Sequence, residues 1–182
     1  MKGFIGIKVW EDGKLKMKKI IYSAVFIMIL TGTDQVIKQL VVRFLKGGDS
    51  VPLIKDILEL EYYENSGAAF NFLVGKTNFL IILTGVVIAF LIWKLVQTLE
   101  VRRYWGMSFC FCLLIGGAIG NLIDRVAKGY VVDFIYCEFL DFPKFNFADM
   151  CVSIGAVLMG LLLITYYCVA DVDFLLSFKG YH

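Results

Sequence analysis

The chain has 182 residues, of which 59% are hydrophobic and only 19% are charged. Its mean hydropathy is +0.77, which is too apolar for an ordinary soluble domain and favours a membrane protein with several spans. The formal net charge of +2 excludes little by itself, and we expect no nucleic-acid partner.

The first 16 residues are mixed and basic and contain no long apolar run. Met17-Lys18-Lys19, followed by apolar residues, is typical of the start of a membrane protein. We therefore interpret residues 1–16 as an extension outside the fold and residues 17–182 as a single membrane domain.

Four apolar segments approach or reach the length of about 20 residues that a helix needs to cross a bilayer. A cleaved secretory signal is an alternative for the first segment, but that segment continues through Asp34, Lys38 and Arg43 without a small-residue cleavage site. We predict spans at residues 20–45, 77–98, 105–125 and 149–171. The predicted fold class is therefore an all-α membrane protein with four transmembrane helices.

The basic residues predict how these spans are oriented, because Lys and Arg near span ends mark the cytoplasmic side. The first 19 residues contain six Lys, and the second and third spans are joined through Lys94, Arg102 and Arg103. The other two connections, residues 46–78 and 124–149, each hold three basic residues against five acidic ones. This alternation places both termini in the cytoplasm.

The first span carries two charged residues on one face. Asp34 and Lys38 are at positions i and i+4, so they are neighbours on a helix. One interpretation is an ion pair, with a structural role for Lys38. The other is that this polar face looks into a site between helices.

The connection after the first span contains a predicted strand and a predicted loop. Leu58-Glu59-Leu60-Glu61-Tyr62 alternates apolar and acidic residues, which is the period of a half-buried strand. Asn65-Ser66-Gly67-Ala68-Ala69-Phe70 follows it. This loop is either a tight turn before the second span or, because its residues are small and Asn65 both donates and accepts hydrogen bonds, a place where a ligand backbone approaches closely.

The third span ends in a polar group. Gly116 and Gly120 have the spacing that lets helices pack closely. Asn121 and Arg125 share a face, with Asp124 beside them. Arg125 forms a salt bridge with Asp124 in one interpretation, and orients a neighbour or a substrate carbonyl in the other.

Two further acids, Asp133 and Asp149, lie where a span meets water. A carboxylate at this position costs free energy, which indicates a functional role. Residues 130–140 are rich in β-branched and aromatic residues, predict a second strand and contain Asp133; Phe142-Pro143 is predicted to break this strand. Asn146 and Asp149 then precede the uncharged run 150–170. Asp149 is expected to be the N-cap of the last helix, which is compatible with a chemical role.

Cysteine and histidine contribute little to the predicted chemistry. We interpret the five cysteines as small buried apolar side chains, and the single histidine is the last residue, His182. A histidine-based metal site or a Ser-His relay is therefore not expected, and we predict neither a metal nor a cofactor.

These polar residues fall in blocks that match a known family, and the match extends over residues 17–170. The chain resembles the lipoprotein signal peptidases (signal peptidase II), bacterial inner-membrane aspartyl proteases. The matching blocks, in order, are Thr33-Asp34-Gln35-Val36-Ile37-Lys38, then Asn65-Ser66-Gly67-Ala68-Ala69-Phe70, then 116–125 leading into Val131-Val132-Asp133-Phe134, and finally Phe145-Asn146-Phe147-Ala148-Asp149.

The resemblance implies four transmembrane helices with a small extracytoplasmic β-like cradle, and a half-helix or loop near the membrane surface. It implies that Asp133 and Asp149 are the catalytic dyad, facing the outer side of the inner membrane. The implied substrate is a prolipoprotein whose cysteine carries diacylglycerol, cleaved just before that cysteine among membrane lipid. We expect a monomer. The supporting polar residues would be Asp34, Lys38, Asn65, Gly67, Asn121, Asp124, Arg125 and Asn146.

Three alternatives stay open from the residues alone. The first is a Ser/Lys membrane peptidase that uses Ser66 or Ser23 with Lys38. The second is a four-helix transporter or lipid-binding scaffold whose acids carry protons or ions, although acids at one face disfavour a conduction path. The third is an assembly subunit that docks through its glycine-rich third helix.

Overall fold

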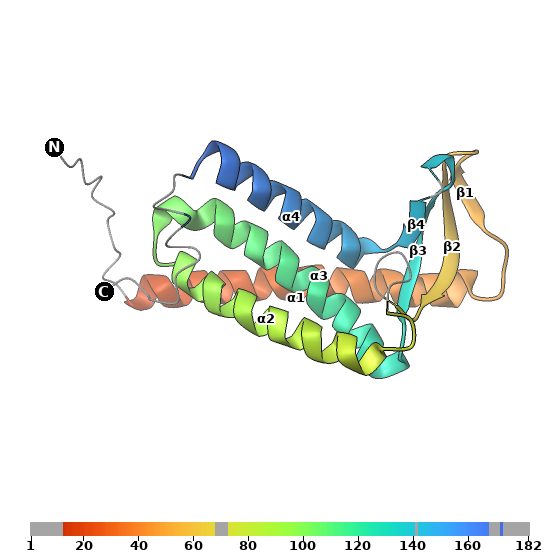
Figure 1. The fold of residues 1–182 in the computed structure, drawn as a ribbon, viewed down its shortest axis with the longest axis horizontal. Helices are drawn as coiled ribbons and strands as arrows, with labels where there is room; N and C mark the ends of the chain where they lie inside the picture. Colours follow the sequence, from red (N-terminus) through yellow and green to blue (C-terminus); the bar gives the residue numbers. More distant parts are fainter. Residues whose placement is uncertain (1–12, 68–72, 141, 168–171, 173–182) are drawn as a thin grey trace.

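The computed structural model describes residues 13–67, 73–140, 142–167 and 172, and they form four long helices and one small sheet (Figure 1). Two short 3-10 helices, Arg102–Tyr104 and Glu138–Leu140, lie between the main elements. The helices are α1 (Gly13–Leu45), α2 (Thr77–Thr98), α3 (Trp105–Lys128) and α4 (Phe147–Thr165). The strands are β1 (Val51–Ile54), β2 (Leu58–Asn65), β3 (Val131–Cys137) and β4 (Phe142–Phe145).

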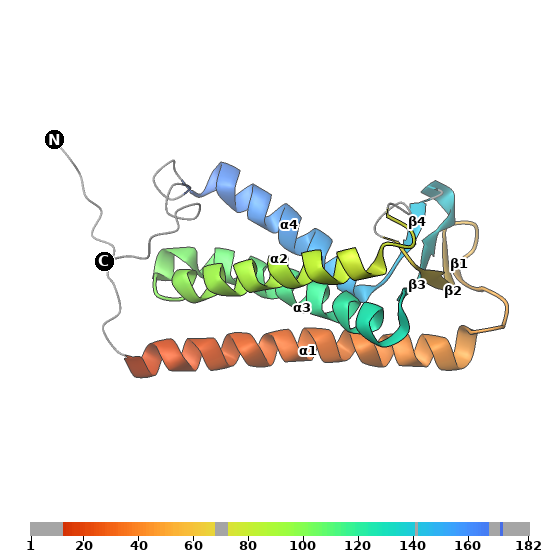
Figure 2. The ribbon, with the colours of Figure 1, turned by 60° about the horizontal axis from the view of Figure 1, so that its bottom comes forward.

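All four helices are long and apolar enough to cross a membrane, which confirms the predicted fold class. Helix α3 is the central one and packs against α1, α2 and α4 (Figures 1 and 2). In the span that includes α3, 61% of the most apolar window is buried, against 17% or less in the other three spans. The outward faces of the other helices are therefore left for lipid.

The helix ends differ from the predicted spans at both ends of the chain. Helix α1 begins at Gly13, so the last residues of the predicted extension continue the first helix, while residues 1–12 lie outside the described part. Helix α4 ends at Thr165, before the predicted end at 171, and residues 168–171 are not described. The division of the chain at residue 16 stays a prediction.

The four strands form one antiparallel sheet in the order β1-β2-β3-β4, at the end of the bundle where α1 ends and α4 begins (Figure 1). Strands β2 and β3 are the two predicted from the sequence. Strands β1 and β4 were not predicted, and the expected break at Phe142-Pro143 is wrong because these residues begin β4. Pro52 and Pro143 lie in the two edge strands, where a missing N–H is tolerated.

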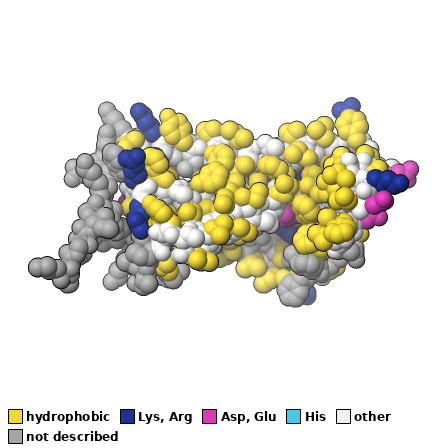
Figure 3. Space-filling model, turned by 90° about the horizontal axis from the view of Figure 1, so that it is seen from above, with side chains coloured by type: hydrophobic (Ala, Val, Ile, Leu, Met, Phe, Trp, Pro, Cys, Tyr) yellow, Lys and Arg dark blue, Asp and Glu magenta, His cyan; other side chains and the backbone are white. Residues whose placement is uncertain are grey.

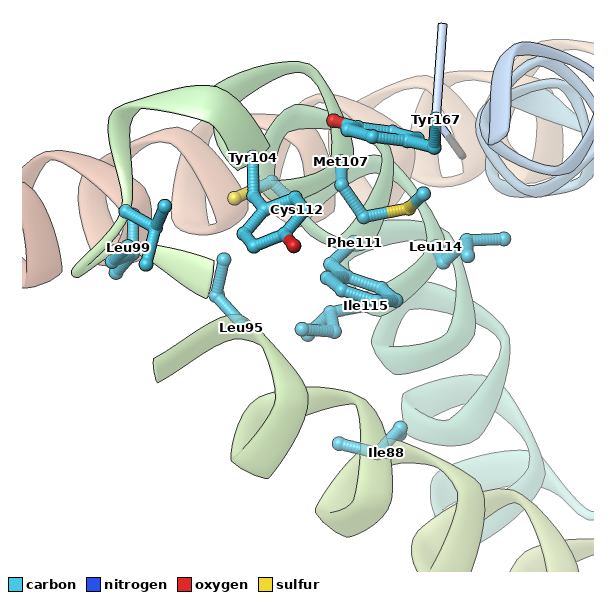
Figure 4. Close-up of a cluster of buried hydrophobic side chains, with 11 residues drawn as sticks. Ile88, Leu95, Leu99, Tyr104, Met107, Phe111, Cys112, Leu114, Ile115 and Tyr167 are labelled. Carbon is cyan, nitrogen blue, oxygen red and sulfur yellow. The ribbon is translucent and has the colours of Figure 1, made fainter. Parts of the chain in front are cut away.

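Two apolar clusters hold the bundle and the sheet together. The larger one joins α2 and α3 and includes the side chains of Tyr104 and Tyr167 (Figure 4). The smaller one packs Val41 of α1 against Val132 and Phe134 of β3. On the face seen in Figure 3, apolar side chains cover the middle, while most of the charged ones lie toward the two ends.

Helix α3 approaches its neighbours most closely at two glycines. A Cβ atom on Gly117 would lie 2.4 Å from the carbonyl oxygen of Ala148 in α4. A Cβ atom on Gly120 would lie 2.5 Å from Oδ2 of Asp34 in α1. Real Cβ atoms do not come this close to other atoms. Only glycine at positions 117 and 120 therefore allows α4 and α1 to pack this closely against α3.

The close approach at Gly117 predicts a stability change. Gly117→Ala should lower the stability by about 1–3 kcal/mol, because the added methyl group overpacks the α3–α4 contact. Gly160→Ala in α4 is the matched control, since nothing lies within 4 Å of its added Cβ atom. Thermal unfolding of the purified variants in detergent measures both, and an unchanged midpoint for Gly117→Ala would contradict the close contact.

Candidate active site

Lys38 of α1 is fully buried and uses all three of its N–H donors inside the protein. Its Nζ atom lies 2.9 Å from Asp34 Oδ2 and 3.0 Å from Asp124 Oδ2, and it donates to Asn121 Oδ1 at 2.9 Å. A buried ammonium is stable only when it is paired and hydrogen-bonded in this way. The ion-pair interpretation of the Asp34 and Lys38 spacing is therefore confirmed, and the pair faces α3. A role of this polar face in a site between helices stays a prediction.

Asp34 extends these contacts to the start of α4. Its Oδ1 atom accepts a hydrogen bond from the backbone N–H of Ala148 at 3.0 Å. This N–H is one of the first in α4, which have no partner within the helix. Gln35 Nε2 supports the carboxylate from the side, at 3.1 Å from Asp34 Oδ2. A residue of α1 thus holds the residue that precedes Asp149.

Asp124 extends the same contacts to β3. Helix α3 ends at Lys128, and its C-cap residue Gly129, with a φ of 83°, turns the chain back along the last helical turn. This turn brings the backbone N–H of Val132 to 3.2 Å from Asp124 Oδ2, while Lys128 Nζ lies 2.8 Å from Asp124 Oδ1. Asp124 thus holds the residue that precedes Asp133.

Asp149 is the third residue of α4, and the N-cap is Asn146. The expectation that Asp149 itself caps the helix is wrong. Asn146 Oδ1 accepts the Asp149 N–H at 2.9 Å, and the Asn146 N–H donates to Asp149 Oδ2 at 3.1 Å, which is a reciprocal capping box. Asn121 Nδ2 donates to Asp149 Oδ1 at 2.8 Å. N–H donors on both oxygens and the positive end of the helix favour a negative charge here, while the burial of the carboxyl group opposes it.

Asp133 is positioned by the alternation of strand β3. Val132 and Phe134 point into the apolar cluster beside α1, so Asp133 points to the opposite face. Its Oδ2 accepts from Asn65 Nδ2 at 2.8 Å and its Oδ1 accepts from Asn146 Nδ2 at 2.6 Å. The side chain is only 1% exposed. Asp133 therefore lies in a fixed, nearly dry position.

Asn146 joins the two acids, since its side chain donates to Asp133 and its backbone N–H donates to Asp149. Every buried side-chain nitrogen and oxygen among the described residues has a hydrogen-bond partner. The contacts link all ten of the predicted site residues into one polar network, consisting of Asp34, Lys38, Asn65, Gly67, Asn121, Asp124, Arg125, Asp133, Asn146 and Asp149.

Burial raises the pKa of Asp133 to about 7, and repulsion from the Asp149 carboxylate adds to this shift. The hydrogen bonds from Asn65 and Asn146 oppose it without cancelling it. Asp133 is therefore about half protonated near neutral pH.

Lys128 pairs with Asp124 from outside the ten-residue network, and with it the charges balance when Asp133 and Asp149 hold one proton between them. Three cations, Lys38, Lys128 and Arg125, then lie among four carboxyl groups that carry three negative charges, those of Asp34, Asp124, Asp133 and Asp149. Two acids that meet at one asparagine can thus hold one proton between them, the arrangement that general acid–base hydrolysis needs.

The two acids open onto a cavity of about 930 Å³ between the sheet and α4. Polar and aromatic side chains from the sheet form one wall, and mainly apolar side chains of α4 form the other. The lining residues are Tyr63, Asn65, Asn121, Arg125, Val131, Asp133, Tyr136, Phe142, Pro143, Lys144, Phe145, Asp149, Met150, Val152, Ser153 and Ile154. The cavity can hold an extended peptide along the sheet and apolar groups along the helix.

Arg125 reaches across the cavity to the predicted loop. Its Nη2 donates to the carbonyl oxygen of Gly67 at 2.9 Å, and the Gly67 N–H donates to Asn65 Oδ1 at 2.9 Å. The expected salt bridge with Asp124 gives way to this contact, because Asp124 is taken by Lys38 and Lys128. Residues 68–70 of the predicted loop lie outside the described part.

Several lining residues were missed from the sequence. Tyr63, Tyr136 and Lys144 belong to strands whose register and edges could not be predicted, and no local motif marks them. Gln35, which hydrogen-bonds to Asp34, was also not predicted. Its position beside Asp34 in the first matching block could have indicated this contact.

The geometry disfavours a Ser/Lys peptidase. The Lys38 ammonium has all three donors engaged, so it offers no free lone pair to take a proton. Ser23 lies 15 residues before Lys38 on the same helix, a rise of about 22 Å. In the described ranges, no group of three or more His, Cys, Asp or Glu is placed to hold a metal ion.

The sequence matches a family described as "Signal peptidase (SPase) II" over residues 26–165. A lipoprotein signal peptidase of Halothermothrix orenii is 45% identical to it over 79% of this chain and 94% of that protein. The corresponding protein of Lactococcus lactis subsp. cremoris is 39% identical over 82% of this chain and 97% of that protein.

Two solved structures described as bacterial membrane enzymes share the fold. One superimposes with a TM-score of 0.72 at 30% identity and covers 97% of this chain and 99% of that chain. The other has a TM-score of 0.68 at 31% identity and covers 89% of this chain and 99% of that chain.

The burial of Lys38 predicts that it is needed for stability. Lys38→Met should lower the stability by about 3–5 kcal/mol, because it leaves two buried carboxylates without their shared cation. Lys128→Met is the matched control: Lys128 pairs with the same Asp124, but its side chain is 30% exposed. Its loss should cost about 1 kcal/mol or less. Similar unfolding midpoints and yields for the two variants in detergent would contradict the assigned role of Lys38.

The raised pKa of Asp133 predicts a pH-dependent stability. With a pKa of about 7, folded Asp133 binds its proton more tightly than Asp133 in the unfolded chain does. The resulting contribution to the free energy of unfolding is complete at pH values below the ordinary Asp pKa, and it is lost as the pH rises through 7. Asp133→Asn does not titrate. Its unfolding midpoint relative to wild type should therefore rise by about 5 °C between pH 5 and pH 8. A constant difference across this range would show that Asp133 does not change its charge there.

Proposed function

The chain belongs to the signal peptidase II family, and from this premise we propose that it is an aspartyl endopeptidase that removes the signal peptide from diacylglyceryl-modified prolipoproteins. The observation that carries the proposal is the meeting of Asp133 and Asp149 at Asn146, on the wall of one cavity. We call these two acids the dyad. Cleavage falls just before the lipidated cysteine.

In this proposal Asp149 is the base and Asp133 is the acid. Asp149 takes a proton from water while the water oxygen bonds to the scissile carbonyl carbon, and Asp133 gives its proton to the carbonyl oxygen. The intermediate then collapses: the C–N bond breaks, Asp149 protonates the departing nitrogen, and Asp133 recovers its proton. The products are a signal peptide with a new carboxyl end and a lipoprotein whose lipidated cysteine has a free amino group.

Local contacts support this division of roles. Asp149 accepts N–H hydrogen bonds on both oxygens at a helix N-terminus, where a negative charge is stabilised. Asp133 is nearly dry in a strand, and its pKa of about 7 keeps a proton available at neutral pH. The pair still titrates as a unit, because each carboxylate affects the other.

The position of the dyad suits a lipid-anchored substrate. Both acids lie at one end of the bundle, where α4 begins and the sheet covers the helix ends (Figure 2). We place this end at the outer face of the bacterial inner membrane and both termini in the cytoplasm, on the charge pattern of the connections. The acyl chains would lie along α4 and the peptide along the sheet.

Substitution of the dyad tests the chemistry. Asp133→Asn and Asp149→Asn should each lower the turnover of a diacylglyceryl-modified prolipoprotein by about a thousandfold, while the protein still inserts and folds. Ser66→Ala is the control and should keep near-normal turnover, whereas a Ser/Lys mechanism that uses Ser66 requires its loss. Gel-shift assays of the purified variants measure cleavage. Near-wild-type turnover in either Asn variant would overturn the dyad.

The same assay tests the substrate class when the unlipidated precursor is incubated beside the lipidated one. The proposal requires shortening of the lipidated precursor only. Equal cleavage of both precursors would show that the diacylglyceryl group is not recognised.

A further inference from the structure

Lys144 of β4 joins three strands on the cavity side of the sheet. Its Nζ atom lies 2.7 Å from Glu61 Oε1 in β2. The same ammonium lies 5.0 Å from the ring centroid of Tyr63 and 5.3 Å from that of Tyr136. An ion pair and two cation–π contacts together hold a long, otherwise mobile side chain in one place.

This arrangement presents a cation to the cavity and keeps its counter-ion at the side. Lys144, Tyr63 and Tyr136 line the cavity, whereas Glu61 is not one of the described residues that do so. An ammonium has three donors, and Glu61 accepts one of them. The pair is neutral overall, but its positive end faces the space that a peptide would fill.

The geometry places this cation on one particular side of the dyad. Tyr63 is the cross-strand partner of Asp133, and both residues line the cavity. The sheet lies beyond the end of α3 and the start of α4, beside the last turns of α1, and so farther from the middle of the helix bundle than the start of α4 (Figure 1). Peptide that runs from the dyad along the sheet is therefore the part on the aqueous side of the scissile bond.

We propose that Lys144 is a specificity-determining residue that favours acidic over basic side chains immediately after the lipidated cysteine of the substrate. The proposal rests on the proposed function, which defines this side of the scissile bond as the mature lipoprotein. Glu61, Tyr63 and Tyr136 act as positioning residues for the ammonium. No chemical step involves Lys144, so its substitution changes which substrate is preferred and leaves the dyad intact.

The expected preference is modest because the site is partly open to solvent. The Lys144 side chain is 20% exposed and that of Glu61 is 39% exposed. A charge pair in such a place changes binding by up to about fivefold, and the effect weakens at high salt. We therefore expect a wild-type kcat/KM that is about fivefold higher for Asp than for Lys at the residue after the cysteine.

The test exchanges the two charges. In the double variant K144E/E61K the ion pair is kept while the carboxylate faces the cavity, so the preference should invert to favour Lys. Lys144→Met removes the charge with little change of volume and should bring the ratio to about one, which keeps the test decisive if the exchanged pair does not fold. The probes are two diacylglyceryl-modified prolipoproteins that differ only by Asp or Lys after the cysteine.

A second ion pair, between Lys46 in the turn after α1 and Glu64 in β2, provides the matched control. Lys46 lies 3.0 Å from Glu64 and 5.2 Å from the Tyr62 ring, but neither charged residue lines the cavity. The variant K46E/E64K should keep the wild-type ratio. An unchanged ratio in both K144E/E61K and Lys144→Met would overturn the inference about Lys144. Failure of wild type to cleave either lipidated substrate would instead overturn the proposed function.

Discussion

The burial of one ammonium group, that of Lys38, is the constraint on which the structure of the proposed active site depends. A lysine at this depth requires acceptors on every side, and Asp34, Asp124 and Asn121 supply them. Each of the two carboxylates also accepts a backbone N–H of another element. Asp34 does so with the oxygen that does not contact Lys38, and Asp124 with the same oxygen that contacts Lys38. These N–H groups belong to Ala148 and Val132, the residues directly before Asp149 and Asp133. A single charge in α1 therefore fixes both members of the dyad, although it contacts neither of them.

The same contacts make the two members unequal. Asp149 begins a helix and receives N–H donors on both oxygens, while Asp133 lies in a strand that is buried on both faces. In the proposed mechanism these different surroundings let one carboxyl hold a proton while the other is ionised, which is what an acid–base pair needs at neutral pH. Asn146 keeps the two together, because its backbone belongs to the cap of α4 and its side chain reaches β3. Asn146 therefore both caps α4 and positions the two acids of the proposed dyad.

The sequence predicted the four spans, the two central strands and the ten residues of the polar network. Span length and apolarity are local properties, and so is the i, i+4 relation of Asp34 and Lys38. The family resemblance supplied the grouping of residues that lie far apart in the chain. Strands β1 and β4 were not predicted, because they depend on pairing with residues far away in the sequence. Both contain proline and form only because an edge of the sheet is available. The cavity residues Tyr63, Tyr136 and Lys144 meet through a strand register with a bulge, which no local pattern specifies.

The central claim is that the dyad shares one proton and that Asp133 holds it at rest. Infrared difference spectroscopy of the purified protein during a pH titration measures this directly, through the carbonyl stretch of a protonated carboxyl group. The account predicts a band in wild type that disappears as the pH rises through about 7, is absent in Asp133→Asn, and persists in Asp149→Asn with a midpoint at lower pH, because the repulsion from Asp149 is removed. A band that survives in Asp133→Asn and vanishes in Asp149→Asn would contradict it.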